Sequence, residues 1–378
     1  MPKTNTILII AGEPSGDMHG ARLVRELKTE HPEYQISAMG SDQLAAAGAE
    51  ILVDAKDLAV VGFVEVLKVL GKLRTAFITL RTYIQLHKPK LVILIDYPGF
   101  NLRMAKVAKQ SGCTVLYYIS PQVWAWHQSR VKKIKRWVDM MAVIFPFEVN
   151  FFQQFDIPAK FVGHPLASAP LTTFTTQAAK QQLGFAETTT VIGLIPGSRN
   201  SEVKAILATL LATAKQLQQT NPAIRFVLPR ATNIDQGWLT TEIQSCEANI
   251  LITETDRYTT MQACDFAIAM SGTVTLELAL LEKPMIIVYK GNPISFWLAQ
   301  KLVKIKHIGL PNIVANKLIV PELLQNEANA NKISVTAQGL LNDEKIPTSL
   351  QQLKAQLNDD NLKIPLIDIV TDLMSTKE

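Results

Sequence analysis

The 378-residue sequence lacks the features that mark several large classes of protein. Its only cysteines, Cys113, Cys246 and Cys264, are far apart and form no C-x-x-C pair, so the sequence predicts free thiols in a reducing compartment. The six histidines are scattered and no D-x-D occurs, so we expect neither a zinc centre nor a metal held by paired carboxylates. No G-x-G-x-x-G, G-x-x-x-x-G-K-[ST], G-x-S-x-G or H-E-x-x-H motif is present.

Long hydrophobic runs and a strong charge imbalance are also missing. The apolar run that follows Lys3 is too short for a signal-peptide core and leads into a glycine turn, so it predicts a first strand and a cytoplasmic protein. The formal net charge is only +5, but lysine and arginine gather among aliphatic residues at 130–136 and 301–306. Such tracts are typical of contact with nucleic acid or anionic lipid.

Short valine, isoleucine and leucine runs alternate with longer helical patterns along most of the chain. This alternation is typical of parallel sheets with helices on both faces. We expect strands at 7–12, 35–39, 91–96, 114–119 and 140–145, and again at 191–195, 224–228, 249–253, 266–270 and 285–289. The predicted fold class is therefore α/β, with two Rossmann-like, doubly wound domains facing a cleft, as in glycosyltransferases of the B type.

The domain boundary is expected in the proline- and threonine-rich stretch 163–177, which shows no clear periodicity. We expect a first domain at 1–165 and a second domain at 166–345. The helical segment 346–378 is expected to cross back to the first domain.

The stretch LIPGSRNSEV predicts a strand, a tight turn and the start of a helix. Ser198, Asn200 and Ser201 are all competent N-cap residues, and Gly197 removes the side chain that would keep a ligand away from the backbone. Free N–H groups at such a helix start attract phosphate, and Arg199 adds a guanidinium group. The turn therefore predicts an anion site, and an ordinary strand-to-helix turn is the alternative.

A second turn of this kind is predicted in FAIAMSGTVTLE, where Ser271, Gly272 and Thr273 follow an apolar run. Glu277 lies four residues after Thr273, so the two side chains share one helix face. A carboxylate repels phosphate but accepts hydrogen bonds from both hydroxyls of a ribose. The two turns together predict a nucleotide site without metal, in which helix starts and basic side chains neutralise the diphosphate. A solvated helix glutamate is the alternative at Glu277.

The first half of the chain offers candidates for a general base. In LVILIDYPGFN, Asp96 stands at the carboxyl end of a predicted buried strand, where desolvation would raise its pKa and allow it to accept a proton from a sugar hydroxyl. An aspartate that only caps the next segment is the alternative. AGEPSGDMHGA places Ser15 and Gly16 in the turn after the first strand, with Glu13 and His19 as further candidate bases.

Two amphipathic stretches favour contact with a membrane surface. Residues 60–80 predict a helix whose apolar arc is wider than packing on one core requires, which fits an interfacial helix; burial between the sheet and another element is the alternative. Residues 120–137 combine tryptophans with lysines and arginines, which suits an interface or a sugar ring. Packing of the tryptophans and RNA binding are the alternatives; the chain has no recognised RNA-binding module, so we expect no nucleic-acid partner.

Eight stretches together resemble the lipid-A-disaccharide synthases of glycosyltransferase family 19: AGEPSGDMHGA, DYPGFN, SPQVWAWHQSRVKKI, FPFE, FVGHPL, PGSRNSEV, SGTVTLE and LPNIVANK. The resemblance extends in order from residue 7 to about 325. It implies that UDP-2,3-diacylglucosamine donates its sugar, with inversion, to the 6-hydroxyl of 2,3-diacylglucosamine 1-phosphate. The products would be the β-1,6-linked lipid A disaccharide 1-phosphate and UDP. It also implies peripheral attachment to the cytoplasmic face of the inner membrane.

The resemblance assigns roles to individual residues. Asp96 matches the essential aspartate of D-x-P-x-F-N, and Arg199 matches the essential arginine of P-G-S-R. The remaining candidates are Gly197, Ser198, Ser271, Gly272, Thr273, Glu277 and Asn312 for the nucleotide, and Glu13, Ser15, Gly16, His19, Asn101 and Gln128 for the acceptor or neighbouring contacts. The chain departs from the pattern at 315–318, where ANKL replaces A-G-R-E, and we expect Asn316 to adopt the left-handed turn that glycine would take there.

Other functions stay open at this stage. One is another UDP-sugar enzyme of the same fold, such as a MurG-like transferase or a UDP-sugar 2-epimerase. Another, of a different class, is a non-catalytic membrane- or RNA-binding protein. Asp96, Glu13 and His19 stay as alternative bases, and oligomeric state and acyl-chain length stay open.

Overall fold

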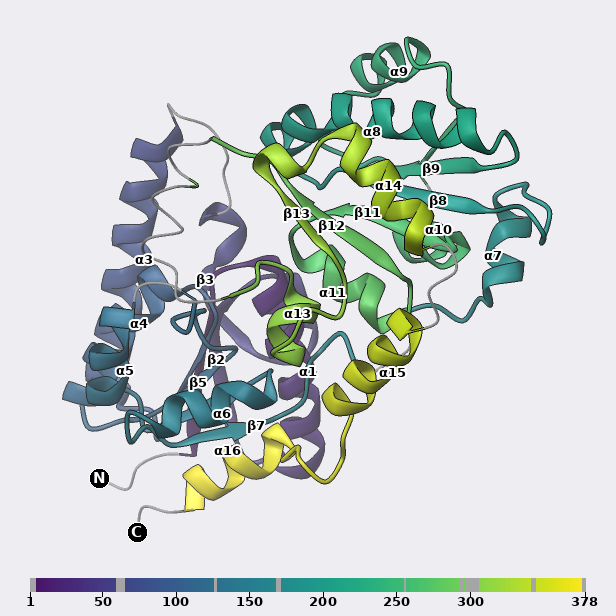
Figure 1. Ribbon diagram of the computed structural model, residues 1–378. Helices are drawn as coiled ribbons and strands as arrows, with labels where there is room; N and C mark the ends of the chain where they lie inside the picture. Colours follow the sequence, from purple (N-terminus) through teal and green to yellow (C-terminus); the bar gives the residue numbers. More distant parts are fainter. Residues whose placement is uncertain are drawn as a thin grey trace. The chain divides into compact units, whose positions relative to one another are not determined.

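The computed structural model describes residues 5–58, 65–125, 128–167, 171–254, 256–292, 296, 306–340 and 345–375 (Figure 1). The chain divides into two compact units, one formed by Met1–Pro165 with Asp359–Glu378 and the other by Leu166–Asn358. Each unit is a parallel sheet with helices on its faces, so the α/β class predicted from the sequence is confirmed.

The first unit contains a seven-stranded sheet in the order β3-β2-β1-β4-β5-β6-β7. Its strands are β1 (Thr6–Ala11), β2 (Gln35–Gly40), β3 (Glu50–Asp54), β4 (Leu91–Ile95), β5 (Thr114–Tyr118), β6 (Met140–Val143) and β7 (Ala159–Phe161). The chain proceeds outward from β1 to β3 and then returns to place β4 on the other side of β1. Such a reversal of strand order leaves a crevice at the carboxyl ends of the two central strands, where ligands bind in this class of fold.

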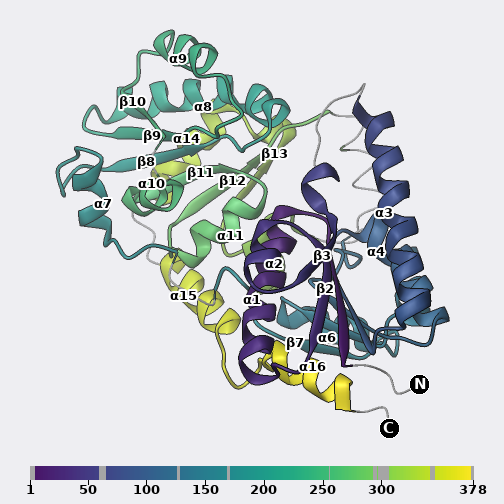
Figure 2. The same cartoon turned by 180° about the vertical axis from the view of Figure 1, so that it is seen from behind.

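Helices cover both faces of this sheet because its strands are apolar on both sides. Ile7 and Ile9 face one helical layer, while Leu8 and Ile10 face the other. The first layer holds α1 (Pro14–Glu30), α2 (Asp42–Ala46) and α16 (Leu366–Ser375), as Figure 2 shows. The second holds α3 (Glu65–His87), α4 (Pro98–Gln110), α5 (Val131–Trp137) and α6 (Pro146–Gln153).

The second unit contains a six-stranded parallel sheet in the order β10-β9-β8-β11-β12-β13. Its strands are β8 (Val191–Ile195), β9 (Arg225–Pro229), β10 (Ile250–Thr253), β11 (Phe266–Met270), β12 (Met285–Tyr289) and β13 (Glu322–Leu324). Here β8 and β11 are the central neighbours at which strand order reverses. This unit therefore has its own crevice position at the carboxyl ends of those two strands.

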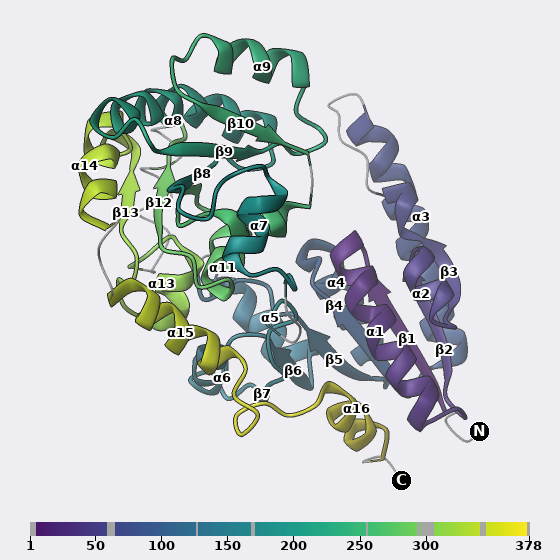
Figure 3. The same ribbon diagram turned by 90° about the vertical axis from the view of Figure 1, so that its right-hand side faces the viewer.

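The helices of the second unit also form layers. On one face lie α8 (Asn200–Thr220), α9 (Gln236–Gln244) and α14 (Ala330–Leu340), and Figure 3 shows α8 beside α14. The other helices are α7 (Thr176–Gln182), α10 (Arg257–Ala263), α11 (Thr273–Leu280), α13 (Leu310–Ala315) and α15 (Lys345–Leu357). Of these, α7 packs on α10, and α15 packs on α11 and α13.

The C-terminal segment does not form a unit of its own. Instead, α15 belongs to the second unit and α16 to the first, so the segment 346–378 divides between Asn358 and Asp359. The reason is apolar burial: Leu350 and Leu353 of α15 are buried in the second unit, whereas Ile369 and Val370 of α16 join the core beside α1.

All ten strands expected from the sequence are present. The sequence analysis did not predict three further strands of the described residues, β3, β7 and β13. Each is three to five residues long and lies at the edge of its sheet, where strands are short and half-exposed and therefore lack a continuous apolar run.

The helix predicted at 60–80 corresponds to α3, which continues to His87. Residues 59–64, and the side chains up to residue 70, lie outside the described residues. Ala76, Leu80 and Ile84 are buried against the sheet, so the described half of α3 follows the alternative of burial. Among the described helices, none carries an apolar stretch long enough to cross a membrane.

Candidate active site

The central strands of the first sheet bring two predicted motifs together. Ala11, the last residue of β1, pairs with Ile95, the last residue of β4, so the turn after β1 and Asp96 lie side by side. The ring of Tyr97 covers Gly12, where an added Cβ atom would come within 2.4 Å of the tyrosine Cδ1. The close approach therefore requires glycine at this position, and it fixes the short connection between β1 and α1 against the Asp96 turn.

Asp96 has an unusual backbone conformation. Asp96 and Tyr97 both adopt left-handed conformations, with φ of 45° and 47°, which costs a residue with a side chain about 1 kcal/mol or more. Hydrogen bonds hold this turn: the Asp96 N–H donates to the carbonyl of Tyr118 at 3.1 Å, and the Tyr117 hydroxyl donates to the Asp96 carbonyl at 2.6 Å. Strained conformations held in this way cluster at functional sites.

Asn101 has a different role from the acceptor contact predicted for it. Its side chain is fully buried, and Nδ2 donates to the carbonyls of Ile95 at 3.0 Å and Asp96 at 2.8 Å. Its Oδ1 is buried without a hydrogen-bond partner among the described residues. Asn101 therefore holds the main chain on either side of the Asp96 peptide and acts as a positioning residue.

The environment of Asp96 suits a general base. Burial, followed by the negative charge of Glu13, raises the pKa of the Asp96 carboxyl from 3.8 to about 6, against a lowering hydrogen bond from the Tyr97 backbone. The desolvation expected from the sequence is confirmed. A carboxylate with a pKa near 6 is ionised at neutral pH and still basic enough to accept a proton from an alcohol in a transition state.

The other candidates of the first unit take varied positions. Glu13 and Ser15 are exposed at the start of α1, whereas Gly16 is buried, and its missing Cβ lets α1 approach β1 and β4. His19 is half-buried, and burial together with a neighbouring arginine lowers its pKa. Gln128 begins a 3-10 turn, but its side chain is outside the described residues.

One acidic residue beside Asp96 was not singled out from the sequence. Asp96 and Glu148 both line a pocket of about 240 Å³. Glu148 is fully buried and accepts hydrogen bonds from Ser120 Oγ, from Trp124 Nε1 at 3.1 Å and from the Phe145 N–H at 3.0 Å. Burial raises the pKa of Glu148 to about 7. Its only signal in the sequence was its place in the FPFE stretch of the resemblance.

The second sheet brings the two predicted nucleotide turns together in the same manner. Ile195, the last residue of β8, pairs with Ala269 near the end of β11. The turn that carries Gly197 therefore lies next to the turn that carries Ser271. Both turns lead into helix starts, α8 and α11, so free N–H groups of two helices gather at this edge of the sheet.

The start of α8 is capped differently from the prediction. The N-cap residue is Arg199, not one of the polar residues around it. Glu202 reaches back over the turn, accepting from the Arg199 N–H at 3.4 Å and from Arg199 Nη1 at 2.7 Å. Its Oε2 lies 2.8 Å from where a Cβ on Gly197 would stand, and Gly197 has a φ of 101°. Ser198 is exposed, and its carbonyl accepts from Asn233 Nδ2 at 2.8 Å.

The start of α11 agrees with the prediction in its arrangement. Gly272 is the N-cap with extended backbone, Thr273 opens the helix, and both are exposed. Ser271 Oγ donates to the carbonyl of Ile308 at 3.1 Å, which ties this turn to the loop before α13.

Glu277 is buried, so the alternative of a solvated helix glutamate is wrong. Only 4% of its side chain is exposed, and Oε1 accepts from Arg257 Nη2 at 2.8 Å and from the Tyr258 hydroxyl at 3.5 Å. Burial raises the pKa of Glu277, and Arg257 and Tyr258 oppose that rise. Both partners come from the start of α10, which sequence reasoning did not connect with this site.

Asn312 also differs from its predicted role as a nucleotide contact. It is fully buried, and its Nδ2 donates to the Val320 carbonyl and to Glu322 Oε1, both at 2.8 Å. Its Oδ1 accepts from the N–H groups of Ile319 at 2.7 Å and Val320 at 3.0 Å. The amide thus uses its full hydrogen-bonding capacity inside the protein. Glu322 in turn accepts from the Gly309 N–H at 2.9 Å, so Asn312 positions the loop that contacts the Ser271 turn.

Two further expectations concern the loop after α13 and a metal. Asn316 ends α13 in the left-handed conformation, with φ of 50°, as predicted for the position where the resemblance has glycine. Among the described residues, no group of three or more His, Cys, Asp or Glu side chains is placed to hold a metal ion.

Comparison with known proteins gives a consistent result. A family model described as lipid-A-disaccharide synthetase matches residues 7–363. The chain is 47% identical over 346 residues to a lipid-A-disaccharide synthase of Trichlorobacter lovleyi, covering 92% of this chain and 90% of the relative. It is 42% identical over 375 residues to a lipid-A-disaccharide synthase of Geobacter sulfurreducens, covering 98% of both.

Among solved structures, the chain resembles the calicheamicin glycosyltransferase CalG4 with a TM-score of 0.61 and 13% identity. The match covers 100% of this chain and 99% of that one. At this identity the likeness concerns the fold alone, which is that of the glycosyltransferases of the B type.

Proposed function

The chain belongs to the lipid-A-disaccharide synthetase family, a glycosyltransferase family of lipid A biosynthesis, and from this premise we propose the specific reaction that it catalyses. UDP-2,3-diacylglucosamine donates its sugar to the 6-hydroxyl of 2,3-diacylglucosamine 1-phosphate. The C1–O bond to UDP breaks as the acceptor oxygen bonds to C1 from the opposite face. The configuration inverts, and the products are the β-1,6 disaccharide 1-phosphate and UDP.

The second unit supplies the groups that bind the donor. The backbone of Gly197 and Ser198 and the starts of α8 and α11 offer N–H groups to the diphosphate, and Arg199 adds a cation. Glu277 serves the ribose, with Arg257 holding its carboxylate in place. These groups neutralise the charge that develops on UDP as it leaves, so the proposal includes neither metal nor other cofactor.

The first unit supplies the base. The observation that carries this assignment is the Asp96 carboxyl, whose pKa is raised to about 6 and whose backbone is locked in a strained turn at the carboxyl end of a central strand. Asp96 takes the proton of the 6-hydroxyl as the new bond forms. Its position is maintained by Asn101 and by Tyr117, which hold its carbonyl through hydrogen bonds.

We also propose that the chain collects its acylated substrates at the cytoplasmic face of the inner membrane. On α3, Ile78 is 50% exposed and Leu86 is 74% exposed, so the described part of this helix keeps apolar side chains on its outer side.

Mass spectrometry of the products formed from the two purified diacylglucosamine substrates tests the reaction directly. We expect a disaccharide 1-phosphate and one UDP for each molecule formed. The rate of an Asp96→Asn variant should be lower by a factor of about 10²–10⁴, which is the usual contribution of a general base. Near-normal turnover of that variant contradicts the base assignment, and efficient activity on UDP-N-acetylglucosamine in place of the acylated donor would favour a MurG-like transferase or a UDP-sugar 2-epimerase instead.

A further inference from the structure

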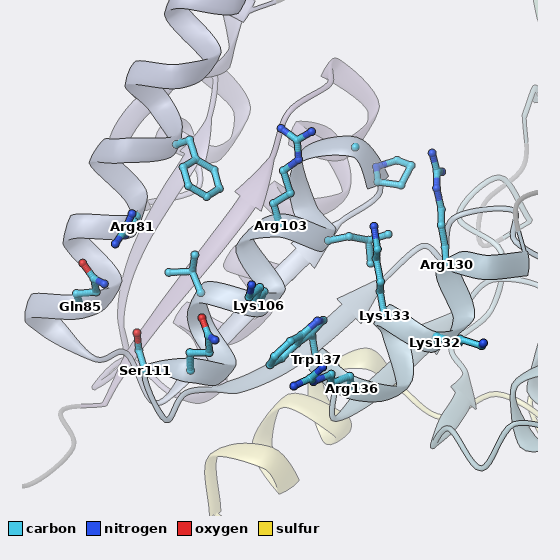
Figure 4. A pocket seen from close by; sticks show the side chains of 16 residues that line it. Arg81, Gln85, Arg103, Lys106, Ser111, Arg130, Lys132, Lys133, Arg136 and Trp137 are labelled. Carbon is cyan, nitrogen blue, oxygen red and sulfur yellow. The ribbon is translucent and has the colours of Figure 1, made fainter.

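The first unit carries a strongly basic pocket outside the groups assigned above. It lies between α3, α4 and α5, has a volume of about 960 Å³, and is lined by seven lysine or arginine side chains (Figure 4). No carboxylate is present among the described residues that line it. Like charges held this close repel one another, so such a lining favours the binding of an anion.

Lysines of the same helices that lie outside the pocket form ion pairs with carboxylates. Lys109 on α4 pairs with Asp139, and Lys135 on α5 pairs with Asp156 at 2.9 Å. Within the described part of the chain, Arg103 on α4 and Lys133 on α5 lie within ion-pair distance of no carboxylate. In Figure 4 both extend toward the same end of the pocket.

The basic pocket adjoins the base. Pro98 and Arg130 line both this pocket and the smaller one that contains Asp96 and Glu148. A third pocket, of about 530 Å³, shares Gly99 and Arg103 with the basic pocket and is otherwise lined mainly by apolar side chains, including Leu73 and Phe100. A ligand that places a hydroxyl at Asp96 can therefore place a negatively charged group among the cations and an apolar group beside α3.

We propose that the basic pocket between α3, α4 and α5 binds the phosphate group of the phosphorylated acceptor lipid. This inference rests on the proposed function and names the part of the molecule that selects the acceptor. A phosphomonoester is close to doubly charged at neutral pH and offers three oxygens to guanidinium and ammonium donors. The two substrates are similar acylated sugars, but only the acceptor carries a free terminal phosphate. A phosphate site in this pocket thus explains why the acceptor, and not the donor, would be held at Asp96.

The test compares the double variant Arg103→Gln/Lys133→Gln with the wild type. The probe is 2,3-diacylglucosamine 1-phosphate in neutral detergent micelles, beside the same lipid without its phosphate, and affinity is measured by calorimetric titration. We expect the variant to bind the phosphorylated lipid about tenfold to a hundredfold more weakly, since each charged hydrogen bond lost costs roughly tenfold. Binding of the lipid without phosphate should change less than about threefold.

Lys135→Gln is the matched control, because it removes one positive charge from α5 outside the pocket, and it should leave both affinities unchanged. Thermal unfolding of each variant checks the fold, and we expect these exposed substitutions to leave the Tm unchanged. The KM for the UDP donor should not move in the double variant, whereas kcat/KM for the phosphorylated acceptor should fall by the same factor as its binding.

Three results would overturn the inference. Equal losses for the two lipids would show that the phosphate is not the group bound. An unchanged micellar affinity with a loss only on vesicles of anionic phospholipid would assign the pocket to the membrane surface. Competition by glucosamine 1-phosphate as strong as by the acylated lipid would assign it to a soluble phosphate. A wild type that binds the lipid selectively but forms no disaccharide would contradict the proposed reaction and leave the site intact.

Discussion

The pKa of Asp96 gives a prediction that separates the candidate bases. Burial is the largest cause of its rise from 3.8 to about 6, and the charge of Glu13 is the second. Replacing Glu13 by Gln removes only the second cause, so the pKa of Asp96 falls by a fraction of a unit, roughly half a unit. The sign follows from charge: a carboxylate without a negative neighbour ionises more easily, so it is active at lower pH.

The consequence for activity can be worked out. At pH 5 about one-tenth of Asp96 is ionised when its pKa is 6, and about one-quarter when it is 5.5. The Glu13→Gln enzyme should therefore be about two to three times as active as the wild type at pH 5 and nearly equal to it at pH 8.

The assay is kcat/KM for the acceptor at saturating donor from pH 4.5 to 8. Glu30→Gln at the other end of α1 removes the same charge far along the helix and should leave the profile unchanged. A fall in kcat/KM by a factor of about 10²–10⁴ at every pH in Glu13→Gln would identify Glu13 as the base. If the acidic side of the kcat/KM profile of Glu13→Gln shifts to higher pH, or does not shift, the coupling between Glu13 and Asp96 is refuted.

Three further predictions concern buried or paired groups. Because burial raises the pKa of Glu148 from 4.5 to about 7, its contribution to stability is complete below pH 4.5 and is lost as the pH rises through 7. Between pH 4.5 and 7 the free energy of unfolding of the wild type should fall by about 3 kcal/mol relative to that of Glu148→Gln, measured as a change in the difference between their Tm values. Tm curves of the two proteins that stay parallel over this pH range would contradict this. Asn312→Ala should destabilise the fold by about 2–4 kcal/mol, since it leaves two buried N–H groups without an acceptor and removes one donor from Glu322, whereas a raised donor KM without a lower Tm would reveal a nucleotide contact. Glu202→Gln should strengthen UDP binding in calorimetric titration about threefold to tenfold, because it removes a negative charge beside the turn and releases Arg199; weaker binding refutes this.

The fold was accessible from the sequence because its central strands are long apolar runs. Strands such as β1 and β4 are buried on both faces, so they have no polar alternation and stand out from the helical pattern. Once the order of strands and helices is recognised, the reversal of strand order predicts which loops meet. The loops after β1 and β4 lie side by side in the structure, and so do those after β8 and β11.

The roles of individual site residues were less accessible, because they depend on burial and on hydrogen bonds that a sequence pattern does not show. Asn101 and Asn312 belong to recognisable motifs, yet both are fully buried and serve the backbone of other segments. A motif shows that a residue type is needed, but it does not distinguish contact with a ligand from support of the residue that makes the contact. Glu148 likewise owes its raised pKa to burial, which its three hydrogen-bonding groups only partly oppose, and no local pattern in the sequence reports that burial.

The two arginine–glutamate pairs of the second unit differ in how easily a ligand can open them. The side chain of Arg199 is 79% exposed and that of Glu202 is 26% exposed, so their pair contributes only about 0.2–0.5 kcal/mol. By contrast, Glu277 is 4% exposed, and removing the half-exposed Arg257 would leave this buried carboxylate with only the Tyr258 hydroxyl, at a cost of about 1–3 kcal/mol. An incoming diphosphate can therefore draw Arg199 away from Glu202 at little cost, while Glu277 keeps its arginine and stays fixed. The mobile pair suits a group whose charge changes during the reaction, and the fixed pair suits a ribose that only has to be held.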